Sequence, residues 1–356
     1  MARHLMEGSE AIAAAAIAAG CRFFAGYPMT PFTEVLENFA RRLPSVDGVC
    51  INAESELEAV GMAWGAVATG ARAATGSTGQ GLALMQESFS EITRAELPLV
   101  IFNMARGQGD YYQATRGGGH GDYRHLVLAP IDVAEATQLT QLAFDLADRW
   151  RNPVLIYGDY LLAHTVEAVD VAPVDFGAVP DKPWAVDGTL GGSGRSRNVN
   201  PLGFDKEKKA GIDPETFWQR LQDKHDEIER REPRCEVEST EGADLVVVAF
   251  GSVARFVRHA VRELRAEGAR VGYARPITLW PFPSAMLAKA CLGAKRVAVL
   301  EQSAGQMIDD VRLTILGAAP VIGIGGISTD PSGFGIGGLL SPDVIRARIE
   351  KALENT

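Results

Sequence analysis

Three carboxylates alternate along the segment AESELEAVGMAWGA, at Glu54, Glu56 and Glu58. A carboxylate that is partly removed from water can take and give a proton, which is the chemistry of a general acid or base. Acidic residues at a helix start are also commonly solvated, because they complement the positive end of the helix dipole. Composition alone favours the solvated acidic face, and the catalytic interpretation stays open.

A glycine-rich segment, TGSTGQG at residues 75–81, separates a strand-like run from a helix-like run. Its amides point toward a helix start, but it lacks the Lys of a P-loop and the GxGxxG spacing of a dinucleotide site. It is therefore a weak phosphate signal. A tight strand-to-helix turn is the alternative interpretation.

Two further polar groups stand in or beside loops. Arg106 follows the apolar run LVIFNMA, and a guanidinium at the carboxyl end of a parallel strand is well placed to bind a carboxylate. His120, in GGGHGDYR, could supply a proton with Asp122 orienting it. The alternatives are a surface arginine in a loop and a structural histidine in a glycine turn.

The four cysteines, Cys21, Cys50, Cys235 and Cys291, are far apart and show no CxxC spacing. The sequence therefore shows neither a zinc site nor an iron–sulfur ligand set, and no metal ligands are assigned. We expect buried, reduced thiols in a cytoplasmic protein.

The charge pattern and hydropathy exclude other classes of partner. The net charge is −10 and the basic residues are scattered, so nucleic acid is not an expected partner. The apolar run at residues 11–20 is too short to span a bilayer, so no membrane association is expected.

Helix and strand signals alternate through the first 160 residues. Strand-like runs occur in CRFFAGY, ARAATG, LPLVIFNMA and VLIYGD, with helical patterns between them. Thr30 before Pro31 predicts a helix start, and Asp132 with Glu135 predicts a capping box. Strands without period-two alternation, separated by helices, indicate a parallel sheet with helices on both faces.

The chain has 356 residues, enough for two domains. Its composition and its alternation of helix and strand signals change twice along the sequence. We predict a first α/β domain over residues 1–163. Residues 164–242 are expected to form an extended crossover with a charged helix, because the segment is rich in Pro and Gly and then in charges. The alternation restarts in a smaller α/β domain over residues 243–356.

Several long motifs resemble the α subunit of the 2-oxoacid:ferredoxin oxidoreductases. They are GYPMTPFTEVLENFA, NAESELEAVGMAWGA, TGSTGQGLALMQE, QATRGGGHGDYR, RPITLWPFP and LEQSAGQMIDDVRL. The sequences of TGSTGQGLALMQE and QATRGGGHGDYR are most similar to the 2-oxoisovalerate type. The resemblance implies a thiamine-diphosphate pyrimidine-binding domain, followed by a domain similar to the transketolase C-terminal domain. It also implies a coenzyme A-acylating enzyme that is active only in a complex.

The resemblance assigns roles to particular residues. Glu56 falls on the position of the family's catalytic carboxylate, which hydrogen-bonds the aminopyrimidine of thiamine diphosphate. Arg106 matches the arginine that binds the substrate carboxylate, and Thr30 matches a threonine that faces the substrate. His120 joins these as a candidate catalytic residue. The implied cofactor-binding residues are Tyr27, Pro28, Glu56, Ser77, Thr78, Gly79 and Gln80.

What the chain lacks implies its partners. There is no GDG-to-Asn segment of the kind that binds Mg²⁺ and diphosphate, and no ferredoxin-like cysteine run. The resemblance therefore implies a β subunit that carries the diphosphate, Mg²⁺ and a [4Fe-4S] cluster. It further implies γ and ferredoxin-like δ subunits, with ferredoxin or another electron acceptor. Thiamine diphosphate would be shared between α and β.

The segment after Arg106 departs from the family by running straight into GQGDYYQA. We expect a shortened loop there to leave space that Tyr111 and Tyr112 line, which favours a bulky branched or aromatic 2-oxoacid such as a phenylglyoxylate-like acid. A pyruvate or 2-oxoglutarate oxidoreductase subunit, a non-oxidative thiamine-diphosphate component and a non-catalytic scaffold subunit are the alternatives.

Overall fold

The computed structural model describes residues 3–186, 214–328 and 341–354. Its larger sheet has seven strands in the order β12-β6-β7-β5-β4-β2-β3. The parallel members are β2 (Phe23–Gly26), β3 (Val49–Asn52), β4 (Ala73–Ser77), β5 (Val100–Ala105), β6 (Leu126–Leu128) and β7 (Val154–Asp159). Every residue of β4, β5 and β7 is buried, as the continuous apolar runs predict.

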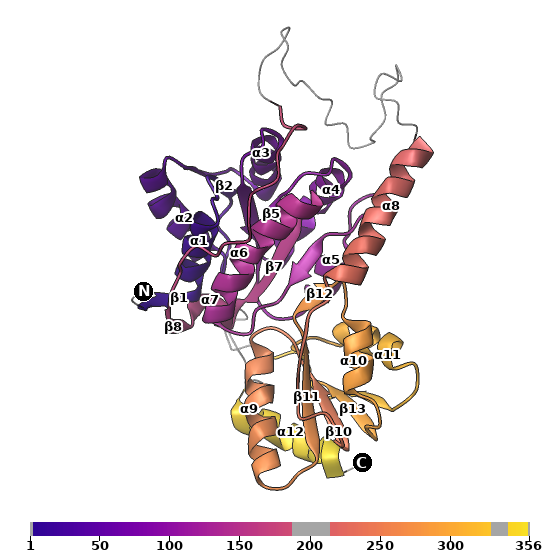
Figure 1. The fold of residues 1–356 in the computed structure, drawn as a ribbon. Coiled ribbons are helices and arrows are strands. Elements are labelled where there is room, and N and C mark those ends of the chain that lie inside the picture. The colour runs from indigo at the N-terminus through magenta and orange to yellow at the C-terminus, as the bar shows by residue number, and fades with distance from the viewer. Residues whose placement is uncertain (1–2, 187–213, 329–340, 355–356) are drawn as a thin grey trace.

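Helices cover both faces of this sheet (Figure 1). Right-handed crossovers that run in opposite directions along the sheet place their helices on opposite faces. The helices α1 (Gly8–Ala18), α2 (Thr33–Arg42) and α6 (Val133–Trp150) therefore pack together on one face, and α3 (Glu56–Ala68) and α4 (Gly79–Arg94) pack on the other. This confirms the predicted covered parallel sheet. Short elements η1 (Leu43–Val46), α5 (Tyr111–Arg116) and α7 (Tyr160–His164) lie between strands.

The predicted helix start at Thr30 is wrong. Helix α2 begins at Thr33, its N-cap residue is Phe32, and no side chain caps it. Residues 30–32 form a turn, and the Thr30–Pro31 peptide bond is cis. This leaves the Thr30 hydroxyl without a capping role.

The N-terminus of α6 is capped as the sequence predicts. The Glu135 N–H donates to Asp132 Oδ1 at 2.8 Å. The Glu135 carboxylate returns to the backbone, but it accepts from Ile131 N at 2.8 Å, one residue before the cap. The same carboxylate also binds Arg275 from β11 (Val271–Pro276), so the cap doubles as a tie to the second sheet.

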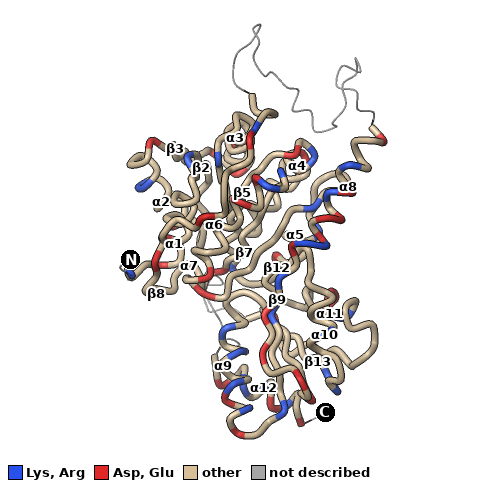
Figure 2. Tube along the Cα trace, in the orientation of Figure 1, with Lys and Arg blue, Asp and Glu red and all other residues tan. Residues whose placement is uncertain are grey.

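The described part of the segment predicted as a crossover contacts the first domain at both of its ends. Strand β8 (Val166–Val169) pairs antiparallel with β1 (His4–Glu7), and Val186 N donates to Ala68 O at the end of α3. Residues 187–213 lie outside the described part. The predicted charged helix is α8 (Pro214–Arg231), which carries both signs of charge (Figure 2) and binds Glu96 through Lys224 and Arg220.

The second sheet has five strands in the order β14-β13-β10-β11-β9. They are β9 (Cys235–Glu238), β10 (Leu245–Val248), β11, β13 (Arg296–Val299) and β14 (Val321–Gly323), and β9 alone among these runs antiparallel to its neighbour. The helices with it are α9 (Val253–Ala266), α10 (Ser284–Ala290), α11 (Met307–Ile315) and α12 (Pro342–Glu354). The division at residue 243 stays a prediction, and β9 precedes it.

One strand joins the two sheets. β12 (Thr278–Trp280) follows β11 in the chain but pairs antiparallel with β6, at the edge of the larger sheet. Since a strand buries its backbone groups only where it pairs, β12 fixes the second sheet against the first. Among the described helices, none combines the length and apolar content needed to cross a bilayer.

Candidate active site

The residues singled out in the sequence gather where β2, β4 and β5 end. These three strands are neighbours in the sheet, and parallel strands bring their carboxyl ends to one edge, where ligands of such sheets bind. Tyr27, Pro28 and Thr30 follow β2, Ser77 ends β4, and Arg106 follows β5. The half-buried Tyr27 and the exposed Pro28 and Thr30 thus stand at the same edge as Arg106.

A cavity of about 580 Å³ opens at this edge, between the two sheets. The first domain contributes Thr78, Gly79, Gln80, Ala83, Arg106, Gly107, Gly109, Asp110 and Gln113, and the second contributes Gln302, Ser303, Ala304, Gln306, Ile327 and Ser328. Arg106 is the only Lys or Arg among these described lining residues. Thr78, Gly79, Gln80 and Arg106 were predicted site residues, and the others were not.

Glu56 is buried beside the turn that lines this cavity. Its side chain is 3% exposed, whereas Glu54 and Glu58 are exposed. Ser77 Oγ donates to Glu56 Oε1 at 3.2 Å. The solvated acidic face is therefore the right interpretation for Glu54 and Glu58 and the wrong one for Glu56.

Gly81 makes room for this carboxylate. A Cβ at Gly81 would lie 2.1 Å from Ser77 Oγ and 2.3 Å from Glu56 Oε1, closer than carbon and oxygen can approach. Gly81 is thus required for close packing between α3 and α4. The segment TGSTGQG is a strand-to-helix turn, since β4 ends at Ser77 and α4 begins at Gly79, and it also carries the polar groups of the site.

Two polar atoms at the cavity have no hydrogen-bond partner among the described residues. They are Thr78 Oγ1, on a residue with 0% exposure, and Gln113 Oε1. Buried polar atoms in native proteins are nearly always paired, so such atoms beside a cavity indicate a place for a polar ligand.

The structure brings Arg106 and Thr30 together. Arg106 Nε donates to the backbone oxygen of Thr30 at 3.2 Å. This bond joins the loops after β2 and β5 across the end of β4. It uses the backbone of Thr30, so the Thr30 hydroxyl is not engaged by this contact.

Asp110 is an acidic wall residue that sequence reasoning missed. Asn103 Nδ2, from inside β5, donates to Asp110 Oδ2 at 3.3 Å, and a Cβ at Gly79 would lie 2.5 Å from Asp110 Oδ1. Burial raises the pKa of Asp110 above its ordinary 3.8, opposed by the Asn103 bond, the charge of Arg106 and the Gly79 amide. Asp110 could have been predicted as a site residue, because it lies in the same loop as Arg106, four residues later.

The second domain supplies the facing wall. Glu301, 3% exposed, accepts from the amides of Gln306, Met307 and Ile308 at 3.0–3.1 Å and so anchors the start of α11. Gln302 and Ser303 come directly after it. These residues follow β13. Because ligands bind at the carboxyl ends of parallel strands, their position in the sequence could have predicted them as site residues.

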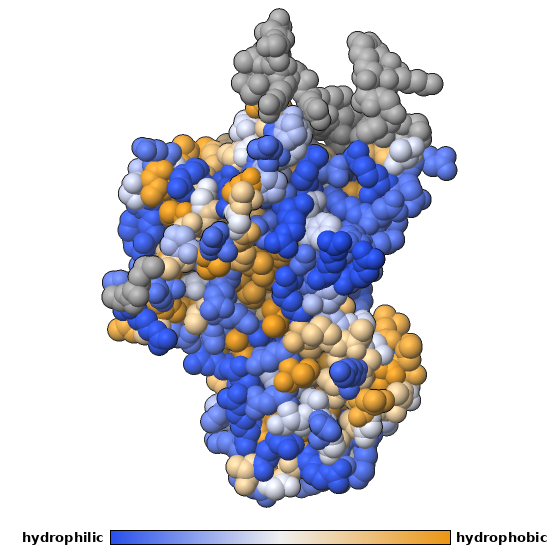
Figure 3. All heavy atoms as spheres, viewed as in Figure 1, coloured by the Kyte–Doolittle hydropathy of each residue, from blue (hydrophilic) through white to orange (hydrophobic). Residues whose placement is uncertain are grey.

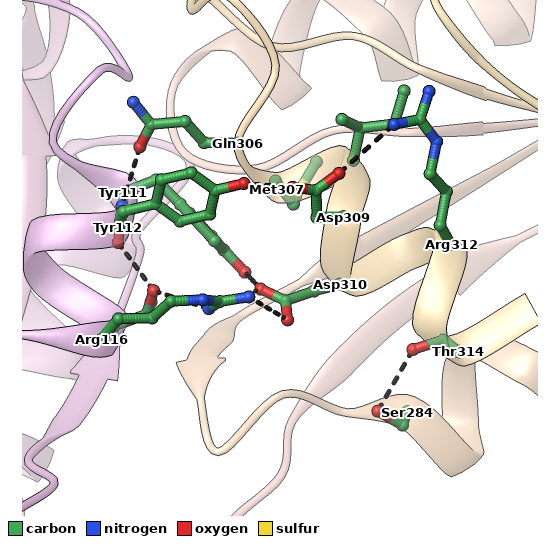
Figure 4. A network of polar contacts seen from close by, with 12 residues as sticks. Tyr111, Tyr112, Arg116, Ser284, Gln306, Met307, Asp309, Asp310, Arg312 and Thr314 are labelled. Carbon is green, nitrogen blue, oxygen red and sulfur yellow. Dashed lines mark hydrogen bonds and ion pairs between the residues drawn. The ribbon is translucent and has the colours of Figure 1, made fainter.

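Tyr111 and Tyr112 do not line the cavity, which corrects the prediction. Tyr111 is fully buried, contacts Phe250 and donates through its hydroxyl to Asp310 Oδ2 at 2.5 Å. Tyr112 hydrogen-bonds Asp309. Figure 4 shows both rings turned toward α11, together with Arg116, which also binds Asp310 at 2.9 Å. The pair holds the two domains together, because both hydroxyls bind carboxylates on α11.

His120 is exposed and is not among the residues that line the cavity. Its amide donates to Glu87 Oε2 at 2.8 Å, and its carbonyl oxygen accepts from Ser90 Oγ. Asp122 lines a different cavity beside α8. These contacts support the structural interpretation of a histidine in a glycine turn.

The cysteines are free, and two of them, Cys21 and Cys291, are buried. Cys50 and Cys235 are only half-buried, so the expectation of four buried thiols is wrong for these two. In the described parts of the chain, no three His, Cys, Asp or Glu side chains gather as a metal ion would require.

Comparisons with known proteins agree with this arrangement. A family described as "Pyruvate flavodoxin/ferredoxin oxidoreductase, thiamine diP-bdg" matches residues 14–184, and one described as "Pyruvate:ferredoxin oxidoreductase core domain II" matches residues 243–332. A ketoisovalerate oxidoreductase subunit VorB from Methanothermobacter thermautotrophicus is 40% identical over 323 residues, which cover 88% of this chain and 90% of the relative. A 2-oxoglutarate synthase subunit KorA from Methanocaldococcus jannaschii is 36% identical over 351 residues, covering 89% and 93%.

Solved structures show the same similarity. The 2-oxoglutarate:ferredoxin oxidoreductase from Magnetococcus marinus, with 2-oxoglutarate, coenzyme A and succinyl-CoA bound, has a TM-score of 0.85 and 26% identity; the match covers 99% of this chain and 65% of that one. A split-gene transketolase, with a TM-score of 0.59 and 17% identity, shares the fold. The chain therefore belongs to the thiamine-diphosphate-dependent 2-oxoacid:ferredoxin oxidoreductase family, as one subunit of such an enzyme.

Proposed function

We propose that this chain is the α subunit of an enzyme that oxidatively decarboxylates a 2-oxoacid to its acyl-CoA. The observation that carries the proposal is the buried Glu56, held by Ser77 next to the cavity that Arg106 lines. Thiamine diphosphate, when bound, supplies the nucleophilic carbon and the electron sink for decarboxylation.

The residues at the site fit the aminopyrimidine end of this cofactor. A carboxylate withdrawn from water at Glu56 can hold a proton against a ring nitrogen, because no solvent competes for the bond. Ser77 keeps the Glu56 carboxylate oriented, and Thr78 Oγ1 is a buried atom that still requires a partner. Tyr27, Pro28, Gly79 and Gln80 stand at the same edge or on the cavity wall.

Arg106 is proposed to bind the carboxylate of the 2-oxoacid, since a guanidinium forms two parallel hydrogen bonds to a carboxylate. Thr30, which contacts Arg106 through its backbone, keeps its hydroxyl for the substrate. His120 loses its proposed catalytic role, because it is exposed and absent from the cavity wall.

The rest of the reaction is assigned to partner subunits. We propose a β subunit that holds the diphosphate, Mg²⁺ and a [4Fe-4S] cluster, with γ and ferredoxin-like δ subunits, and ferredoxin or another acceptor. Helix α3, which begins at Glu56, supports a partner at this place. It exposes Leu57 (56%) and Met62 (38%), and Leu84 of α4 is 51% exposed. Apolar side chains exposed together mark an interaction surface.

The substrate is proposed to be a branched-chain 2-oxoacid. The most similar relatives named above include a ketoisovalerate oxidoreductase subunit, and one cation on the described cavity wall suits a monocarboxylate. 2-Oxoglutarate, the substrate class of the KorA relatives, carries a second carboxylate. An aromatic, phenylglyoxylate-like substrate has lost its support, because Tyr111 and Tyr112 face α11.

The test is a comparison of kcat/KM for four acids in the purified complex that contains this chain. With coenzyme A and an artificial electron acceptor, 2-oxoisovalerate should exceed pyruvate, 2-oxoglutarate and phenylglyoxylate. A preference for 2-oxoglutarate would overturn the substrate proposal. Turnover of none of the four acids would overturn the proposed reaction.

A further inference from the structure

The segment that carries Arg106 has little stiffness of its own. It reads Arg106-Gly107-Gln108-Gly109-Asp110, with glycines on both sides of Gln108. Glycine loses more conformational freedom on folding than any other residue, so a segment with two of them is held in place only by its contacts. Both glycines line the cavity, so movement here would displace the Arg106 guanidinium.

Gln108 ties this segment to the second domain. It is 1% exposed, and its side-chain Nε2 donates to Phe250 O at 2.8 Å, just after β10. Its Oε1 accepts from Gln302 N at 2.7 Å, just after β13, and its backbone N–H donates to Gln302 O at 3.0 Å. One side chain therefore joins the loop after β5 to the ends of two strands of the other sheet.

A second glutamine, Gln306, holds the adjacent residues. Its Nε2 donates to Gly109 O at 2.7 Å, and its Oε1 accepts from Tyr112 N at 2.8 Å (Figure 4 shows the latter). Gln108 and Gln306 thus join the cavity wall after β5 to the second domain by hydrogen bonds.

We infer that Gln108 is a positioning residue, which sets the place of the Arg106 guanidinium and thereby the affinity of the site for the carboxylate of the 2-oxoacid. This inference rests on the proposed role of Arg106. Gln108 itself is not on the cavity wall, so it acts through Arg106 rather than on the substrate.

The inference predicts a particular kinetic signature. A carboxylate clamp holds the substrate before and during reaction alike, so weakening it raises KM more than it lowers kcat. In the complex, Gln108→Met, which keeps the length of the side chain and removes both polar ends, should raise KM for the 2-oxoacid roughly tenfold or more while kcat stays within about threefold.

Gln141→Met is the matched control. Gln141 is 3% exposed and makes the same kind of clamp, donating to Ala172 O at 3.0 Å and accepting from Val174 N at 2.8 Å, but it lies on α6 away from the cavity. Its KM should remain within twofold of the wild-type value. Equal KM values for the two variants, or an unchanged KM in Gln108→Met, would overturn the inference.

A double mutant separates positioning from general structure. If Gln108 acts through Arg106, adding Gln108→Met to Arg106→Ala should raise KM no further, because interacting residues are non-additive. Additive effects would overturn the inference.

Hydrogen exchange provides a readout that does not need turnover, and its wild-type measurement does not need a variant. In the wild-type complex the Gln108 amide should exchange slowly, and in Gln108→Met the amides of residues 107–110 should exchange faster. Fast exchange in the wild type would overturn the clamp. A complex that turns over no 2-oxoacid but shows the slow Gln108 amide would overturn the proposed function and leave the clamp standing.

Discussion

Burial distinguishes Glu56 from the two carboxylates beside it. Glu54 precedes α3, and Glu56 and Glu58 lie in its first turn, yet only Glu56 points under α4, where Gly81 has no side chain and Ser77 donates to it. The two neighbours remain exposed to water.

Glu56→Gln should lower kcat of the complex roughly 10²-fold or more, the usual scale for losing a positioned acid–base group. Gln keeps the shape and can still accept from Ser77, but it cannot exchange a proton. Steady-state kinetics would measure the loss. Glu54→Gln, at an exposed position in the same motif, is the control. A kcat within threefold of wild type would remove Glu56 from the mechanism.

Asp110 should make stability depend on pH. Because burial raises its folded-state pKa above 3.8, the stability that its protonated form contributes is fully present below 3.8 and is lost as pH rises through the raised value. Asp110→Asn cannot ionise. The stability of this variant relative to wild type should therefore increase as pH rises from 3.8.

Urea denaturation midpoints at a series of pH values from 3.8 to 7 would measure this difference. Asp122→Asn, at an exposed position, is the control. A difference between Asp110→Asn and wild type that stays constant with pH, or that changes in the opposite direction, would contradict the assignment.

At the scale of the element, α3 carries the carboxylate that we propose to be catalytic at its first residue, and it has an open face along its length. Leu57, Gly61 and Gly65 are four residues apart and so lie on one face, and a Cβ at either glycine would meet no atom of the described chain within 4 Å. Glycine inside a helix is unfavourable by about 1 kcal/mol relative to Ala. The two glycines lower the stability of the helix, and no close contact in the described part of the chain requires a glycine at either position.

Gly65→Ala should stabilise the isolated chain by about 0.5–1 kcal/mol, since the helix gains propensity and nothing is displaced. Gly65→Leu should leave the chain folded but weaken its assembly with the β subunit, because a large side chain would keep a partner from approaching α3. Thermal denaturation and size-exclusion chromatography of the co-expressed subunits measure the two effects. Ala266→Leu, exposed on α9, is the control for assembly. Unimpaired assembly of Gly65→Leu would place the partner elsewhere.

A second apolar surface lies on the other domain. Leu292, Leu313 and Leu316 are 80%, 64% and 83% exposed on and beside α10 and α11, where Figure 3 shows orange atoms gathered. The charged residues of α8 and α9 lie elsewhere on the molecule (Figure 2).

At the scale of the whole molecule, the two sheets form one unit because three kinds of contact join them. Strand β12 pairs with β6, the tyrosines of α5 bind α11, and Arg275 of β11 forms an ion pair with Glu135 of α6. Arg275 is 2% exposed and also binds Glu236 at 2.7 Å. The cavity lies between these contacts, so its shape depends on all of them.

Arg275→Met should lower the free energy of unfolding by on the order of 3 kcal/mol, because it leaves Glu135 without this cation and leaves Glu236 with Arg258 alone. This is the lower end of the range for buried pairs, since the side chains of Glu135 and Glu236 retain 20% and 27% exposure. Urea denaturation would measure the change.

Arg262→Met is the control for Arg275→Met. Arg262 also pairs with a β9 carboxylate, Glu238, at 2.8 Å, but its side chain is 58% exposed. Exposed pairs contribute under about 1 kcal/mol. Equal losses for the two variants would show that burial of Arg275 does not matter.

The sequence alone indicated the long buried strands such as β4, β5 and β7, their parallel arrangement and the edge at which ligands meet. Continuous apolar runs such as VIFNMA form only where both faces of a strand are covered, and the polar residues that follow them must lie at one edge. The family motifs placed Glu56 and Arg106 at that edge. These are local signals, because each depends on residues that are neighbours in the sequence.

Tertiary structure alone decided which of these residues face the cavity. Tyr111 and Tyr112 follow Arg106 closely in the chain but turn to α11, because Asp310 and Asp309, nearly 200 residues later, accept hydrogen bonds from their hydroxyls. The glutamines of the second wall follow β13, and their approach depends on β12 crossing to the first sheet. Contacts between distant parts of a chain leave no periodicity in the sequence, so only the folded molecule shows them.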